Sequence, residues 1–449
     1  MKLENLTFLG GIHVKEHKEL SNGSEITPMP APAEVKLSLS QHGGAPAKLL
    51  VAKGDTVKVG QVIAEAGGFV SAPVHSSVSG EVVSIEKYLT APGMTVDAVV
   101  IKNDGLDTLG YEPVDRSQED LTPEEIIKYI TEAGIVGMGG AGFPTHVKLM
   151  PPKDATIDTM IVNAAECEPY LTCDELTMRT YPEKVVQGLK LAMKATKAKK
   201  GYIGIEDNKP KAIAAIEKAC ANEPNITVAV LKTKYPQGDE KQLAFAITGK
   251  RIPAGKLPAH IGVVISNVST VCAICDAVYY GKPLYERVVT VTGKGVNSPK
   301  NLLVRFGSRI KDVVEFCGGY STTPGKILFG GPMMGVAQYT DEAVTDKRNN
   351  GILVLTKEEA EPKPVDPCIR CGDCVEACPM QLEPLYLASA SKAENWDLAK
   401  EYYVTQCVEC GACSYVCPSH RPLTEYIRYG KRTVMAMQRA EAAKATEKK

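Results

Sequence analysis

Short apolar runs separated by glycines are the dominant pattern in the N-terminal part of the chain. They recur through residues 34–103, with turn-type steps between them, such as Gly-Asp at 54–55 and Gly-Gly at 67–68. Strands of this length, bounded by such turn residues, are typical of a small all-β domain. We therefore predict an N-terminal β domain over residues 1–108.

A different periodicity begins after a polar linker at residues 104–120. Thr122, followed by a proline and two glutamates, is a typical start of a helix. Beyond it, short apolar runs alternate with segments of helix length. The predicted strands are 156–163, 201–205, 226–232 and 262–265, and the predicted helices are 183–198 and 209–221. This alternation predicts an α/β domain with a largely parallel sheet over residues 120–280.

Two further regions follow. Residues 284–340 begin with the order strand, turn, strand, helix, and we assign them to a separate module. Residues 358–434 hold two cysteine-rich runs, with helical segments predicted around 382–392 and 396–404 between them. The charged, alanine-rich tail at 435–449 is predicted to be a fraying helix. The predicted fold class is a multidomain chain of α/β and α+β units.

Length, composition and charge narrow the class of protein. A chain of 449 residues is too long for one hydrophobic core. A content of 44% apolar and 23% charged residues is that of an ordinary globular protein. The 52 basic and 53 acidic residues nearly cancel, which argues against a nucleic-acid-binding protein. No apolar run approaches the roughly 20 residues of a membrane-spanning helix, so we expect any tie to a membrane to come through a partner.

The strongest chemical signal is a doubled cysteine pattern near the C-terminus, C-x2-C-x2-C-x3-C-P. The first copy holds Cys368, Cys371, Cys374 and Cys378, and the second holds Cys407, Cys410, Cys413 and Cys417. This spacing is typical of two [4Fe–4S] clusters, because three thiolates of a run bind one cluster and the fourth binds the other. We predict one cluster on Cys368, Cys371, Cys374 and Cys417, and the other on Cys407, Cys410, Cys413 and Cys378.

Other uses of these cysteines are less favoured. Structural zinc usually comes from paired C-x2-C knuckles that leave no cysteine over. Disulfides need an oxidising compartment, whereas fourteen cysteines without an N-terminal secretory signal indicate a reducing one. The six scattered cysteines are predicted to be buried small hydrophobic residues. They are Cys167, Cys173, Cys220, Cys272, Cys275 and Cys317.

Candidate ligand-binding residues follow the predicted strands of the α/β domain. The segment GMGGAGFPTHVK at 137–148 has glycines whose N–H groups can cradle a phosphate, and Lys148 adds a positive charge. It matches neither G-x-G-x-x-G nor G-K-[ST], so its spacing leaves a plain flexible loop open. Glu166 and Glu168 follow the first predicted strand and Glu240 follows another. Ligands of open α/β sheets bind at the carboxyl ends of strands, where these acids would lie.

The segments GMGGAGFPTHVK, NAAECEP, YPQGDEK and VISNVST resemble the flavin- and NADH-binding module of the FMN-carrying subunit of respiratory complex I. The resemblance implies non-covalently bound FMN, and NAD(H). Glu166, Glu168 and Glu240 would shape the nicotinamide pocket as the catalytic residues, without acting as general acids. The implied cofactor-binding residues are Gly137, Gly139, Gly140, Gly142, Phe143, Lys148, Asn163, Glu166, Glu168, Tyr235, Glu240 and Asn267. The chain departs from the family at Ala165, where an acid is usual, and at Ser266, where an asparagine is usual.

Three other regions resemble known modules. The phrases LLVAKGDTVKVGQVIAE and SAPVHSSVSGEVVSI resemble biotinyl and lipoyl carrier domains, which are barrel-sandwich hybrids. The hairpin AEAGGFVSAP lacks the modifiable lysine, so we expect a structural or partner-docking role. Residues 284–340 resemble the soluble-ligand-binding β-grasp (SLBB) module, expected to act as a rigid spacer. The cysteine region resembles α-helical ferredoxin domains.

The whole domain order, with the opening FLGGIH, resembles the C-subunit family of the Rnf, or Rsx, complexes. This implies a peripheral subunit on the cytoplasmic face of the cell membrane, in an ion-translocating ferredoxin:NAD(+) oxidoreductase. Electrons would pass between NAD(H), FMN, two 4Fe-4S clusters and partner subunits of integral-membrane and ferredoxin-like type, and so indirectly to ferredoxin. Two alternatives stay open: a soluble flavin and iron–sulfur cobalamin reductase, and a non-enzymatic zinc-stapled scaffold.

Overall fold

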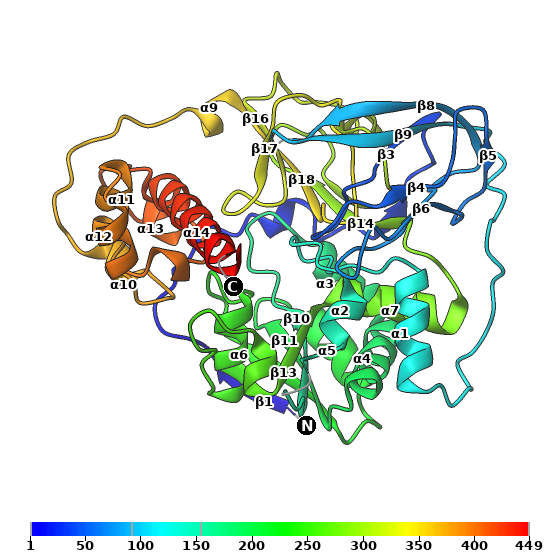
Figure 1. Ribbon diagram of the computed structural model, residues 1–449, viewed down its shortest axis with the longest axis horizontal. Coiled ribbons are helices and arrows are strands. Elements are labelled where there is room, and N and C mark those ends of the chain that lie inside the picture. Colours follow the sequence, from blue (N-terminus) through cyan, green and yellow to red (C-terminus); the bar gives the residue numbers. More distant parts are fainter. Residues whose placement is uncertain (1, 91–92, 153–154, 448–449) are drawn as a thin grey trace.

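The computed structural model describes residues 2–90, 93–152 and 155–447, and its named strands form four sheets (Figure 1). The predicted multidomain fold class is confirmed. Residue 1 of the predicted first domain lies outside the described part of the chain, as do residues 448–449 of the tail predicted at 435–449. Among the described residues, no helix combines the length and hydropathy needed to cross a membrane.

The α/β domain has a parallel sheet in the order β1-β12-β11-β10-β13. Its strands are β1 (Lys2–Leu6), β10 (Thr159–Ala164), β11 (Lys200–Glu206), β12 (Ile226–Leu231) and β13 (Val263–Asn267). The helices are α1 (Pro123–Glu132), α2 (Thr145–Leu149), α3 (Cys173–Thr180), α4 (Pro182–Thr196), α5 (Pro210–Ala219), α6 (Glu240–Thr248) and α7 (Val268–Tyr280). The parallel sheet predicted from the alternation is therefore confirmed.

Strand alternation explains how both faces of this sheet are covered. Met160 and Val162 belong to a large apolar core that includes residues of α1, α4, α5 and α7. Ile161 lies between them in sequence and packs in a separate core with Leu243 and Ala244 of α6. Successive strand side chains point to opposite faces, so a sheet buried on both sides needs a continuous apolar run.

The barrel-sandwich domain consists of two small antiparallel sheets. One contains β3 (Glu34–Ser38), β9 (Thr95–Asn103), β8 (Gly80–Leu89) and β5 (Thr56–Val57), and the other contains β4 (Lys48–Leu49), β6 (Val62–Glu65) and β7 (Val74–His75). The β-grasp module has the sheet β17 (Val336–Gln338), β16 (Lys326–Phe329), β18 (Gly351–Leu355), β14 (Glu286–Thr292), β15 (Lys300–Arg305) and β2 (Ile26–Pro28), packed with α8 (Ile310–Phe316).

The cluster domain is helical and follows α9 (Lys357–Ala360) and an extended linker. Its helices are α10 (Asp373–Glu376), α11 (Pro384–Lys392), α12 (Trp396–Glu401), α13 (Ala412–Tyr415) and α14 (Leu423–Glu447). Figure 1 shows this domain, coloured orange to red, beside the α/β domain. Gln242 of α6 donates a hydrogen bond to the Met380 sulfur at 3.3 Å, which ties the two domains together.

The first strands of the chain do not join the barrel-sandwich domain that follows them. β1 pairs with β12 in the α/β sheet, and β2 pairs with β15 in the β-grasp sheet. We call the connecting residues 7–25 the N-terminal strap. Nothing in the apolar pattern of residues 1–108 anticipates these pairings, because strand partners this distant in sequence are set by tertiary packing.

Candidate functional site

A cavity of about 730 Å³ lies where all four domains meet. The glycine-rich loop 137–143 and the turn after β10 form the α/β side of its wall. Tyr88 of β8, Met334 of the β-grasp module and Cys410 of the cluster domain also line it. Cofactor sites typically occupy roughly 300–1,000 Å³, so the volume fits a cofactor with part of its substrate.

Most of the residues predicted to bind cofactors come together in this cavity. Those that line it are Gly137, Gly139, Gly140, Phe143, Lys148, Asn163, Glu166, Glu168, Tyr235, Glu240 and Asn267. Gly142 is the exception. It has φ +64, and a Cβ there would lie 2.8 Å from the Arg348 side chain. Its carbonyl accepts the Gly43 N–H at 2.9 Å, so Gly142 joins the loop to the barrel-sandwich domain from behind.

The glycine-rich loop is closed by its own backbone. The Gly137 N–H donates to the Phe143 carbonyl at 2.8 Å. Gly140 has φ +121, and a Cβ there would meet no atom within 4 Å, so the backbone itself forms the cavity wall. The N–H groups of Gly139, Gly140 and Ala141 have no hydrogen-bond acceptor in the described part of the chain. Such free, adjacent donors fit a phosphate group.

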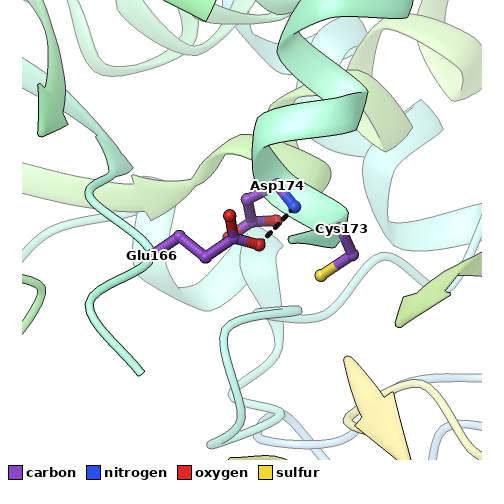
Figure 2. Close-up of side chains that lie close together, drawn as sticks. All are labelled: Glu166, Cys173 and Asp174. Carbon is purple, nitrogen blue, oxygen red and sulfur yellow. Dashed lines mark hydrogen bonds between the residues drawn. The ribbon is translucent and has the colours of Figure 1, made fainter. Parts of the chain in front are cut away.

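We call residues 164–171 the glutamate turn, and its acids fix neighbouring elements. The Glu166 carboxylate accepts the N–H group of Asp174 at 2.6 Å (Figure 2). It also accepts that of Glu175 at 3.1 Å, so it holds the start of α3. The Glu168 carboxylate accepts those of Met333 at 3.1 Å and Met334 at 2.8 Å. Both acids therefore hold walls of the cavity in place.

Glu166, Cys173 and Asp174 form a compact group, with ligand-type atoms within 4.8 Å of one another (Figure 2). Burial, together with the neighbouring Glu166 carboxylate, raises the pKa of Asp174 to about 6. Asp174 accepts hydrogen bonds from Asn267 Nδ2 at 2.7 Å and Ser269 Oγ at 3.0 Å. All four carboxylate oxygens of Glu166 and Asp174 thus accept hydrogen bonds from the protein itself.

The third predicted acid lies across the cavity. Glu240 begins α6, and its Oε1 lies 2.7 Å from the Lys148 Nζ of α2. Asn163 ties the glutamate turn to the same side, since its Nδ2 donates to the Gly238 carbonyl at 2.7 Å. The Gly238 N–H in turn lies 3.3 Å from the Cys167 sulfur. Lys148 and Glu240 are partly exposed, so they are available to a ligand.

Four cysteines of the cluster domain lie together. Cys378, Cys407, Cys410 and Cys413 line one small cavity together. Burial, together with the neighbouring thiols, raises the pKa of Cys410 and of Cys413 to about 12. Burial, together with the neighbouring Cys371 and Cys417 thiols, raises the pKa of Cys374. Burial favours the neutral thiol, whereas iron binds the thiolate. A bound metal therefore has to offset the cost of ionising a buried cysteine.

We call residues 368–378 the outer run and residues 407–417 the inner run. Cys368 and Cys371 are exposed, whereas Cys410 and Cys413 are buried. Cys410 lines the large cavity together with Tyr235. The Tyr235 hydroxyl donates to the Cys410 carbonyl at 2.7 Å, so a buried side chain connects the cavity to the inner run.

Two contributions to the cavity have no signal in the sequence. Arg287 of β14 is 3% exposed, and its Nη2 donates to the Met138 carbonyl in the glycine-rich loop at 2.9 Å. The β-grasp module is therefore more than the expected spacer. Lys18 of the strap binds the glutamate turn through backbone carbonyls. A lone basic residue usually lies on the surface, so neither position stands out along the chain.

Four family models match successive parts of the chain. They are described as the RnfC barrel sandwich hybrid domain at residues 6–106, the Nuo51 FMN-binding domain at 130–276, the SLBB domain at 288–337 and the 4Fe-4S dicluster domain at 367–420. These descriptions agree with the predicted fold class and with the predicted FMN and 4Fe-4S cofactors.

Three curated proteins, each the C-subunit of its complex, are similar along most of the chain. The one from the Na(+)-translocating ferredoxin:NAD(+) oxidoreductase complex of Acetobacterium woodii is 47% identical, over 98% of this chain and 99% of that protein. The one from the proton-translocating ferredoxin:NAD(+) oxidoreductase complex of Clostridium ljungdahlii is 46% identical, over 98% and 96%. The one from the ion-translocating oxidoreductase complex of Rhodobacter capsulatus is 42% identical, over 86% and 75%.

Proposed function

Because the chain belongs to the C-subunit family of ion-translocating ferredoxin:NAD(+) oxidoreductase complexes, we propose that its central cavity is where NAD(H) exchanges electrons with FMN. FMN, when bound, takes up two electrons as a hydride and releases them singly, which clusters require. The chain's own residues bind and orient the cofactors. The observation that carries the proposal is that the glycine-rich loop and Cys410 line the same cavity.

The predicted residues would divide the binding between them. The free N–H groups of the glycine-rich loop, with Lys148, would hold the FMN phosphate. Phe143, which is 40% exposed at the loop, would stack against a ring of the dinucleotide. Glu166, Glu168 and Glu240 would shape the nicotinamide pocket through position, without proton transfer. Asn163, Tyr235 and Asn267 would complete the wall.

The cluster domain would carry electrons in a fixed order. Cys378, Cys407, Cys410 and Cys413 would hold an inner cluster next to the cavity, since they surround one small cavity and Cys410 reaches the large one. The outer cluster would be held by the other four cysteines. They are Cys368, Cys371, Cys374 and Cys417. Electrons would leave where Cys368 and Cys371 are exposed.

We further propose limits for the domains and a place for the chain within its complex. The domain limits would be 1–108, 120–280, 284–340, 358–434 and a tail at 435–449. The chain would sit peripherally on the cytoplasmic face of the membrane, bound to integral-membrane and ferredoxin-like subunits of its complex. Ferredoxin would exchange electrons with it only through those subunits. Nucleic acid would have no part, as the balanced charge of the chain suggests.

The test is anaerobic purification followed by measurement of iron, zinc and released flavin, and then addition of NADH. We expect about eight iron atoms and one FMN per chain, with bleaching of both flavin and cluster absorption by NADH. Zinc in place of iron, without flavin, would support the scaffold alternative and reject the proposal. Rapid NADH-dependent reduction of a corrinoid would favour the cobalamin reductase.

A further inference from the structure

Lys18 is buried in the strap and bound only by backbone. Its side chain is among the buried charged groups, with the residue 6% exposed. The Nζ donates to the carbonyl oxygens of Glu166 at 2.8 Å, Glu168 at 3.1 Å and Leu171 at 2.6 Å. An ammonium has three donors, so all of them are used. In the described part of the chain, Lys18 forms no ion pair with a carboxylate.

The glutamate turn that Lys18 holds is the point where three walls of the cavity are attached. The Glu166 carboxylate holds α3, the Cys167 sulfur accepts the N–H of Gly238, and the Glu168 carboxylate holds the β-grasp loop. Glu166 has φ 51 and Tyr170 has φ 70, a backbone region that such residues rarely occupy. A conformation of this kind persists only when surrounding contacts impose it.

The same strap also contacts the inner cluster's ligands. Ile12 and Tyr235 exchange backbone hydrogen bonds at 2.8 Å in both directions, and the Gly11 N–H donates to the Ala377 carbonyl at 3.0 Å. Gly10 has φ +74, and a Cβ there would lie 2.5 Å from the Cys378 carbonyl oxygen. The strap therefore contacts both the glutamate turn and Ala377. Ala377 precedes Cys378, the outer-run cysteine that would bind the inner cluster.

We propose that Lys18 is a positioning residue for electron transfer from NADH. Its ammonium gathers three carbonyls of the glutamate turn and so fixes the cavity walls against the nicotinamide and flavin rings. Lys18 touches neither cofactor site directly in this arrangement and acts through the turn. The inference rests on the proposed flavin and NAD(H) site and adds to it a residue from outside the α/β domain.

The test compares Lys18→Met with the wild-type chain and with Lys15→Met, an exposed lysine of the same strap. Methionine keeps the length of the side chain but removes its charge and donors. We expect the rate of flavin bleaching at saturating NADH to fall by about 100-fold in Lys18→Met, the effect of roughly a 1 Å misplacement of reacting groups. Iron content, circular dichroism and cluster reduction by dithionite should stay unchanged. Lys15→Met should match the wild type.

A second variant guards against misfolding. Lys18→Gln offers two N–H donors without charge, so we expect a bleaching rate between those of Lys18→Met and the wild type. Normal bleaching in Lys18→Met would overturn the role of Lys18 while leaving the proposed function intact. Absence of NADH bleaching in the wild-type chain would reject the proposed function instead. If both variants lose iron and secondary structure, Lys18 serves folding alone and the proposal is wrong.

Discussion

The outer and inner cysteine runs have matching backbones. Arg370 and Glu409 occupy equivalent positions, with φ 56 and φ 57, and the following glycines, Gly372 and Gly411, have φ 91 and φ 83. In each run an N–H lies close to the sulfur of the first cysteine, at 3.4 Å from Arg370 and 3.3 Å from Glu409. The repeated spacing thus sets one ligand geometry twice.

Their surroundings differ. Glu409 pairs with Arg428 at 2.8 Å and Lys431 at 2.9 Å on α14, and Cys410 lies against the cofactor cavity. Arg370, the counterpart of Glu409, forms no ion pair within the described residues, and Cys371, next to it in the outer run, is exposed. Sequence spacing therefore determines the backbone geometry of each run, whereas tertiary packing determines which run lies against the cavity.

The largest effect is expected from Cys378→Ser. Although Cys378 belongs to the outer run, we expect this change to remove the inner cluster and to lower the iron content from about eight to about four per chain. NADH would then bleach the flavin but leave the outer cluster oxidised. Iron analysis and EPR spectra after NADH and after dithionite would measure this. Cys220→Ser, outside the cluster domain, is the control. Loss of the outer cluster's signal would contradict the crossed arrangement.

Cys417→Ser should give the opposite result with a smaller effect. It lies in the inner run, yet we expect it to remove only the outer cluster. NADH should still reduce the inner cluster, while reduction of an added one-electron protein acceptor becomes slow because the exposed exit is missing. Transient absorbance and EPR would separate the two steps. An inner cluster that NADH no longer reduces would show that the two runs do not exchange their fourth ligands.

Tyr235→Phe tests the connection between the inner run and the cavity. It removes the hydroxyl that donates to the Cys410 carbonyl and leaves that buried acceptor without a partner. We expect the free energy of unfolding of the cluster domain to fall by roughly 1–3 kcal/mol. Denaturant titration followed through cluster absorbance would measure the loss. Tyr403→Phe, at a residue 66% exposed, should have no effect. If the two variants were equally stable, the Tyr235 hydroxyl would not stabilise the contact between the cavity and the inner run.

A further effect concerns the cavity wall beside the inner run. Burial raises the pKa of Glu168 to about 7 from an ordinary value of 4.5, against the lowering effect of the Met333 and Met334 N–H groups and Lys18. The folded chain therefore binds this proton more tightly than the unfolded chain. Its contribution to the free energy of unfolding should decrease as pH rises from about 4.5 to about 7.

Glu168→Gln keeps the shape of the side chain and cannot ionise. We expect the decrease in stability over this pH range to become smaller in the variant, measured by denaturant titration at several pH values. Glu183→Gln, on the first turn of α4 and outside the cavity, should keep the wild-type slope. A Glu168→Gln slope equal to that of the wild type would show that Glu168 titrates near its ordinary value.

Local chemistry made much of the site predictable. The cysteine spacing and the glycine-rich segment each indicate a type of ligand within a few consecutive residues. All residues predicted to bind cofactors in the α/β domain, except Gly142, line one cavity. The detailed use of the acids depends on backbone conformation. Glu166 accepts the first N–H groups of α3 from a backbone with positive φ, and no residue pattern reports that conformation. Lys18 and Arg287 lie outside the α/β segment altogether, so their place in the site follows from domain packing.

The strap also bears on how the chain reaches its folded state. Lys2 pairs with Val228, and Ile26 pairs with Asn301. In each of these pairs the first residue is synthesised long before its partner. Contacts this distant in sequence slow folding, and domains made early usually fold first. Strands β1 and β2 must therefore wait for partners that are made later, so the strap between them can be fixed against the cavity only after residue 301 has been synthesised.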